Sequence, residues 1–150
     1  MELATLGLIG SKIIIIQLSA KYDMLNFKEF FENFDYKDQE FSDKNGLYSV
    51  SQMIDYSNKN KTLQNIDTKM LLHNLEPSEY ETGSDLPGHP EFIKRAEAAS
   101  LEYPIVVVEY PDGLWIADGV HRLYKANQLG LKTIKGYILD NSELDQFKKN

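Results

Sequence analysis

The last third of the chain alternates apolar runs with turn residues in an order that few folds accommodate. Residues 104–109 (PIVVVE) form a β-branched apolar run, which is typical of a strand buried on both faces. Asp112 and Gly113 then predict a tight hairpin turn. Three elements follow, separated by turn residues: a strand over 114–117, a helix over 120–129 that ends at Gly130, and a strand over 133–139. Together with a helical pattern over 91–101, this order predicts an α+β (mixed α/β) fold with a small mixed sheet.

The first part of the chain is expected to form an extension that packs on this core, with domain boundaries at 1–62 and 63–150. The β-branched run within 13–18 predicts a strand. Residues 35–46 are acidic and polar and end in the turn signal Asn45-Gly46, and residues 76–90 are expected to form a long loop rich in glycine and proline. Three segments have helical character: 24–34, which carries Phe27, Phe30, Phe31 and Phe34; 49–58, capped at Ser49 or Ser51; and the end of 63–75, where a turn opens at Asp67 or Thr68 after a short strand.

Composition restricts the classes of function. The chain has 150 residues, the usual size of one domain, and no cysteine, which excludes disulfides and a cysteine nucleophile. Absence of cysteine also fits a cytoplasmic location. The net charge of −7 argues against non-specific DNA binding, because a protein that coats duplex needs a basic face. Residues 6–18 are apolar but too short to span a bilayer, and Lys12 interrupts them, so no membrane association is expected.

The junction between the predicted strand and helix, residues 117–125 (ADGVHRLYK), carries the clearest chemistry. Gly119 lets the chain turn sharply, and the first N–H groups of a helix have no intrahelical acceptor. Together with the helix dipole, these groups favour an anion. Arg122 is suited to bind two phosphate oxygens at once, and His121 and Lys125 lie close enough along the helix to add further groups. The spacing therefore predicts a phosphate site at this junction.

A purely structural role explains the same residues. Asp118 would be the helix N-cap, and Gly119 would be a turn residue. Arg122 would pair with an acidic side chain, and His121 would be an ordinary half-buried histidine. The residues alone leave both alternatives open.

Residues 91–139 resemble the core of the ParB N-terminal and sulfiredoxin superfamily. The resemblance rests on short matches in a fixed order: Pro104-Ile105, Ile116 to Gly119, His121 to Leu123, Ala126, Leu129-Gly130 and Ile134. It implies a compact ParB/sulfiredoxin-like domain that binds a nucleoside triphosphate, ATP or CTP, with Mg²⁺. By position, Gly119, His121 and Arg122 would contact phosphate. Asp118 would hold the loop or help to position a metal.

The chain also departs from that family. Sulfiredoxins need a cysteine beside the His-Arg pair, and Val120 stands there, so reduction of a sulfinic acid is excluded. In the related kinases, a carboxylate activates the acceptor hydroxyl, and Glu76 is the first candidate for that role. Its alternative is a solvated loop acid. His89 is expected either to reach a ligand or to be a loop residue without a task, and His73 is expected to cover a helix surface. The three histidines lack the spacing of a zinc site, so no protein metal ligands are assigned.

Two functions from different classes follow. The first is nucleotide binding, extended to phosphoryl transfer or hydrolysis in a kinase or NTPase, with Glu76 and His121 as the catalytic residues. Asp118, Gly119, His121, Arg122 and Lys125 would bind the nucleotide. The second is a non-catalytic module that keeps the fold for contact with a protein or nucleic acid. In that case the aromatic stripe of 24–34 would face a protein partner or the second subunit of a homodimer.

Overall fold

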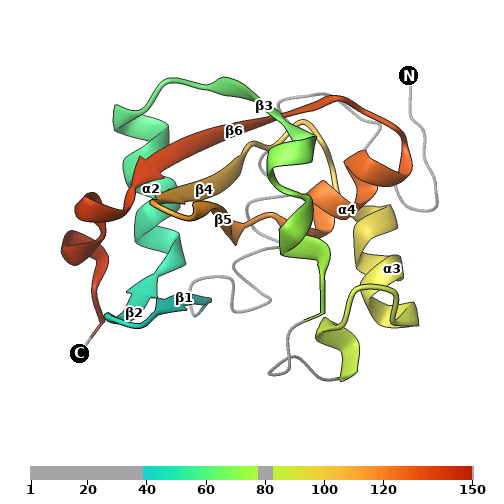
Figure 1. Cartoon of the computed structure of the whole chain (residues 1–150), viewed down its shortest axis with the longest axis horizontal. Coiled ribbons are helices and arrows are strands. Elements are labelled where there is room, and N and C mark those ends of the chain that lie inside the picture. The colour runs from blue at the N-terminus through green and yellow to red at the C-terminus, as the bar shows by residue number, and fades with distance from the viewer. Residues whose placement is uncertain (1–38, 78–82, 150) are drawn as a thin grey trace, which may run out of the picture. The chain divides into compact units, whose positions relative to one another are not determined.

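The computed structural model describes residues 39–77 and 83–149 (Figure 1). The chain divides into two compact units, Met1–Gln39 and Glu40–Asn150, and every element below belongs to the second. The predicted strand over 13–18 and the predicted aromatic helix over 24–34 therefore lie outside the described residues.

The second unit combines helices and strands in a mixed α+β fold, as the sequence predicts. Its strands and helices follow in this order: β1 (Glu40–Asp43), β2 (Gly46–Ser49), α2 (Val50–Asn60), β3 (Gln64–Asp67), α3 (Pro90–Ala98), β4 (Ile105–Tyr110), β5 (Gly113–Asp118), α4 (Val120–Gln128) and β6 (Thr133–Asp140). Short 3₁₀ segments add to these: Thr68–Met70, Leu72–Leu75, Gly83–Asp85 and Asn141–Phe147.

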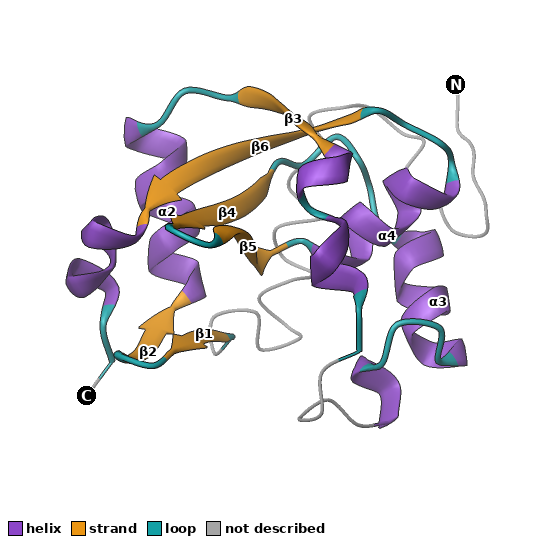
Figure 2. Ribbon diagram, in the orientation of Figure 1, coloured by secondary structure: helices purple, strands orange, loops and turns teal. Residues whose placement is uncertain are grey.

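The main sheet has four strands in the order β3-β6-β4-β5 (Figure 2). β4 and β6 run parallel, with Val107 opposite Ile138, whereas β3 pairs with β6 and β5 pairs with β4 in antiparallel fashion. The sheet is therefore mixed, as expected. α4 connects β5 to β6, which allows β6 to lie beside β4 in the parallel direction. β4 is thus a central strand, and its apolar run is buried on both faces.

The side chains of β4 alternate between two separate cores. Ile105 and Val107 face the side of α4, and Val106 and Val108 face the side of α2. The first core also contains Ile66, Leu71, Leu114, Leu123, Ala126 and Ile134. The second contains Tyr48, Met53, Leu139, Leu144 and Phe147. The β1–β2 hairpin, α2 and the closing segment Asn141–Phe147 therefore contribute to the core on one face of the sheet, and the candidate junction belongs to the other face.

The β1–β2 hairpin was not predicted: residues 35–46 were described only as an acidic, polar stretch that ends in the turn signal Asn45-Gly46, and that signal lies at the turn between the two strands. The Asp43 carboxylate contributes to the stability of the hairpin by accepting hydrogen bonds from Tyr110 Oη at 2.6 Å, Asn45 N at 2.7 Å and Tyr48 Oη at 3.1 Å. Burial acts to raise the pKa of Asp43, but these hydrogen bonds outweigh it and lower the pKa below the ordinary value. The polar hairpin is thus held by a hydrogen bond from Tyr110, which lies 67 positions after Asp43.

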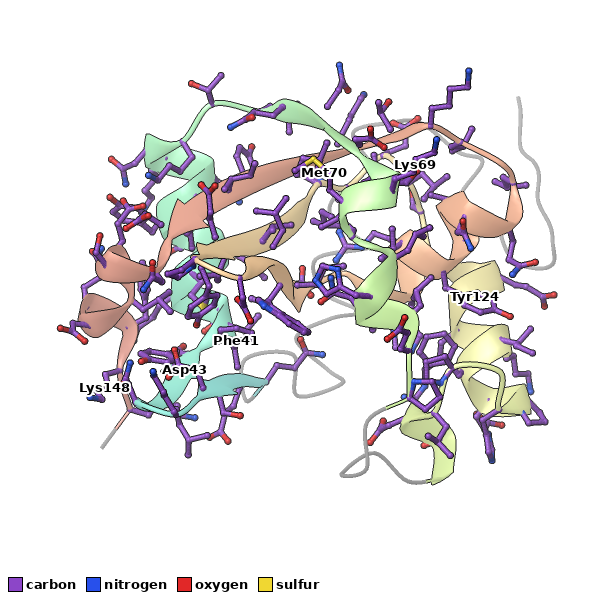
Figure 3. The ribbon with its side chains drawn as sticks, viewed as in Figure 1. Phe41, Asp43, Lys69, Met70, Tyr124 and Lys148 are labelled. Carbon is purple, nitrogen blue, oxygen red and sulfur yellow. The ribbon has the colours of Figure 1, made fainter. Side chains whose placement is uncertain are left out.

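The side chains of the hairpin and of α4 lie on opposite sides of the view in Figure 3, where Phe41 and Asp43 mark the hairpin and Tyr124 marks α4 beside α3.

The closing segment Asn141–Phe147 was also not predicted. It begins with a capping box, in which Asp140 accepts from the Ser142 amide and Glu143 accepts from the Asp140 amide.

Candidate functional site

The junction between β5 and α4 is built around Gly119, which is the N-cap of α4 and has a φ of 118°. A Cβ at this position would lie 2.8 Å from Ile105 Cβ and still closer to its Cγ2, so only glycine fits without displacing the central strand. Glycine has no side chain with which to cap the helix, and the first helical bond runs from Leu123 N to Gly119 O. The amides of the first turn therefore lack a capping side chain.

Arg122 and Asp118 form an ion pair across one helical turn, with 2.7 Å between Arg122 Nη2 and Asp118 Oδ2. The two side chains are only 12% and 11% exposed. Arg122 Nη1 also donates to the carbonyl oxygens of Tyr103 at 3.0 Å and Pro104 at 2.8 Å. The guanidinium therefore fastens the start of β4 to the junction.

These contacts test the N-cap role considered for Asp118. The N-cap position belongs to Gly119, so the alternative in which Asp118 caps α4 is wrong. Its carboxylate binds Arg122 instead. The acidic partner foreseen for Arg122 is thus found four residues before it. Three of the five guanidinium N–H groups are used in these bonds.

Lys125 lies one turn further along α4, and its ammonium satisfies the end of α3. Lys125 Nζ donates to Ala99 O at 2.6 Å and to Glu97 O at 3.0 Å. These carbonyls belong to the last turn of a helix, where a cation is favoured. Burial lowers the pKa of Lys125, and the nearby charge of Glu97 opposes that effect. The expected phosphate-binding lysine therefore joins two helices in this structure.

His121 packs against α3. Its ring lies 4.5 Å from the ring of Phe92, centroid to centroid, and Phe92 is fully buried and also meets Tyr124 edge-on. The Nε2 atom of His121 is buried and has no hydrogen-bond partner among residues 39–77 and 83–149. Such an atom is uncommon, because a buried polar group without a partner costs free energy.

The electrostatic surroundings of His121 favour the neutral imidazole. Burial lowers its pKa most, and the positive charges of Arg95 and Arg122 lower it further. The negative charges of Asp85 and Asp118 act in the opposite direction without cancelling the shift. At neutral pH these surroundings therefore favour the uncharged form of His121.

The remaining candidates lie apart from this arrangement. Glu76 is exposed at the end of the Leu72–Leu75 segment, and no hydrogen bond or ion pair of its carboxylate is found in the described part of the chain. His89 is the N-cap of α3, where its Nδ1 accepts from Glu91 N at 3.1 Å. The structure thus brings together Asp118, Gly119, His121 and Arg122, but it does not bring Glu76 into contact with them.

The β5 edge of the sheet holds residues whose roles differ from expectation. His73 does not cover a helix, because its Nε2 lies 2.6 Å from the carbonyl oxygen of Leu114 in β5. Trp115 in β5 is 37% exposed and meets His73 edge-on. Trp115 Nε1 donates to Asp112 Oδ1 at 3.1 Å. β5 is an edge strand, so one of its sides has no neighbouring strand. The periodicity of a sequence does not reveal which strand lies at the edge of a sheet.

Sequence reasoning missed Phe92 and Arg95 on α3 as neighbours of His121, and it missed the carbonyls of residues 103 and 104 as partners of Arg122. Arg95 had no signal beyond its place in a helix. Every residue has a backbone carbonyl, so no pattern of side chains could have indicated that the carbonyls of residues 103 and 104 bind Arg122. Phe92 did carry a signal, since it is an apolar residue on the helical face predicted to be buried.

A hollow of about 190 Å³ lies elsewhere on this unit, and none of the junction residues lines it. Its lining residues are Asn65, Leu101, Leu131, Thr133, Ile134 and Lys135. Among residues 39–77 and 83–149 there is no cluster of three or more histidine, aspartate or glutamate side chains that would hold a metal ion. In the same ranges, no helix has the length and apolar character needed to cross a membrane.

Comparison with known proteins adds no relative from which a role could be read: no protein-family model matches the chain, and no curated protein matches it.

Proposed function

We propose that this protein binds a nucleoside triphosphate, ATP or CTP, together with Mg²⁺, and that the phosphates bind at the junction of β5 and α4. The observation that carries the proposal is the uncapped first turn of α4, which begins at a glycine held in a left-handed conformation. The amides of such a turn are suited to an anion. The resemblance of residues 91–139 to ParB/sulfiredoxin-like domains supports the same ligand.

The contacts of the side chains assign different tasks within this proposal. Gly119 allows close approach of phosphate to the backbone, and the first amides of α4 donate to it. His121 supplies a nitrogen that has no partner in the described part of the protein. Arg122 and Lys125 mainly hold β4 and α3 in place, because three hydrogen bonds of Arg122 and two of Lys125 go to the protein itself. Asp118 keeps Arg122 oriented.

Phosphoryl transfer or hydrolysis is the finer part of the proposal. His121 would act beside the phosphates, and Glu76 would orient the nucleophile once a bound substrate brings them together. A general base must come within hydrogen-bond reach of the proton that it removes. The absence of cysteine supports a cytoplasmic location as part of the same proposal.

The test uses a charge placed at the first position of α4. Val120→Asp sets a carboxylate beside the helix N-terminus, where the dipole favours it, so the fold should tolerate the change. The same carboxylate would repel phosphate. Val120→Asn is the matched control, because it has the same shape without the charge. Isothermal titration with ATP, ADP, CTP and GTP, each with Mg²⁺, should show binding by wild type and the Asn variant and at least a tenfold loss in the Asp variant.

Arg122→Ala is a poor test of the same idea. It would leave the largely buried Asp118 carboxylate without its partner and would lower stability whether or not phosphate binds. If no nucleotide binds to folded wild-type protein, the nucleotide proposal is wrong. The alternative, a non-catalytic module that binds a protein or nucleic acid, would then be pursued through the residues before position 40. If nucleotide binds, analysis of the products separates an enzyme from a binding protein.

A further inference from the structure

His121 is a half-buried titratable residue, and the fold leaves its buried ring nitrogen Nε2 without a hydrogen-bond partner in the described ranges. Its Nε2 atom finds no donor or acceptor in the described ranges, and one side of the imidazole lies against the Phe92 ring. Whichever tautomer is present, this nitrogen carries either an unmet N–H or an unmet lone pair. A buried polar atom without a partner calls for an explanation, and a bound ligand that completes it is one such explanation.

We propose that His121 takes up a proton when a phosphate group binds at the β5–α4 junction, so that anion binding and proton uptake are coupled. The inference rests on the proposed phosphate site and adds a regulatory property to it. Binding is then strengthened as the pH falls from the alkaline side toward 6.

The balance of charges around the ring gives the reason. Arg95 on α3 and Arg122 on α4 oppose a proton on His121, whereas Asp85 and Asp118 favour it. With burial added, the pKa of the free protein lies below the ordinary 6.5. A phosphate group with nearly two negative charges, bound at the same helical turn, would offset both arginines. It would also offer an acceptor to a protonated Nε2, which the described residues do not provide.

The coupling is measured by calorimetry in two buffers that differ in ionisation enthalpy, at pH 7, with the Mg²⁺-nucleotide that binds best. The expected result is uptake of up to about one proton per ligand by wild type. His121→Gln should still bind, more weakly, and should take up no proton. His89→Asn is the matched control, because it removes another imidazole while leaving an N-cap residue on α3. It should show the same uptake as wild type.

A nucleotide has titratable phosphates of its own, so a second readout uses sulfate, which keeps its charge throughout this pH range. NMR titration of the His121 ring should give a pKa that rises when sulfate is added. Binding without proton uptake, or uptake that persists in His121→Gln, overturns the coupling and leaves the nucleotide proposal intact. If neither nucleotide nor sulfate binds, both proposals are wrong.

Discussion

At the scale of single residues, the junction depends on Gly119. Its φ of 118° and its contact with Ile105 are two separate demands that no other residue meets. The contact places the start of α4 directly against the central strand. Arg122 also secures this place, through hydrogen bonds to the carbonyl groups of residues 103 and 104. The geometry of the proposed site is therefore fixed before any ligand arrives.

Gly119→Ala should destabilise the protein by about 3 kcal/mol or more, because a strained φ and a steric overlap with Ile105 add together. Gly130→Ala is the control: its φ is 72°, and no atom lies within 4 Å of an added Cβ. That variant should lose about 1–2 kcal/mol from the backbone alone. Urea denaturation followed by circular dichroism compares the two. Equal losses would show that the approach to Ile105 is unimportant.

At the scale of elements, part of the sheet edge at β5 is covered by the side chains of His73 and Asn74. Asn74 Nδ2 donates to Leu114 O at 3.1 Å and to Leu71 O at 2.9 Å, and Asn74 Oδ1 accepts from Ile116 N at 2.9 Å. One amide thus takes the place of a neighbouring strand for part of β5. An open edge invites pairing with another chain, and this amide reduces that exposure.

Asn74→Asp is expected to cost about 2–3 kcal/mol of stability, because an acceptor would replace the donor that faces two carbonyl oxygens. Asn65→Asp is a suitable control, since residue 65 is exposed on β3. It should change stability by less than about 0.5 kcal/mol. The measurement is the urea midpoint of each variant at neutral pH. A loss in Asn74→Asp no greater than in the control would show that the edge amide is dispensable.

At the scale of the whole second unit, polar contacts join distant parts of the chain. Glu143 accepts hydrogen bonds from Lys61 at 2.7 Å, from the Asp140 amide at 2.8 Å and from Tyr56 at 3.1 Å. Burial acts to raise its pKa, but these three donors outweigh burial and hold the pKa below the ordinary 4.5. The end of α2 is fastened to the segment after β6 in this way.

Acid should therefore weaken this connection. The unfolded chain binds a proton at Glu143 more readily than the folded one, so the contribution is present above pH 4.5 and is lost as the pH falls through the lowered pKa. Glu143→Gln should be less stable than wild type at pH 7, and the difference should narrow toward pH 3. Urea denaturation at several pH values measures it, with Glu102→Gln, an exposed position, as the control. A difference that stays constant with pH would contradict the assignment.

Much of the second unit was predictable from local patterns. The helix over 49–58 is α2 with Ser49 as its cap, and the turn at Asp112-Gly113 joins β4 to β5. The helix over 120–129 is α4, and Gly130 follows it with a positive φ. These features depend on periodicity, capping and turn chemistry, which neighbouring residues determine. The glycine at the head of α4 belongs to the same class.

The sequence by itself determined the mixed α+β class, the order of most elements and the position of the junction, because each of these is encoded within about ten neighbouring residues. Only the tertiary structure decided how the charged side chains are used. Arg122 and Lys125 look the same in the sequence whether they bind phosphate or protein carbonyls. In the structure they donate hydrogen bonds to backbone carbonyl oxygens within residues 97 to 104. The β1–β2 hairpin likewise depends on Tyr110, far along the chain. Contacts between residues far apart in the chain can override the local conformational preference of a segment, and they leave no periodic pattern in the sequence.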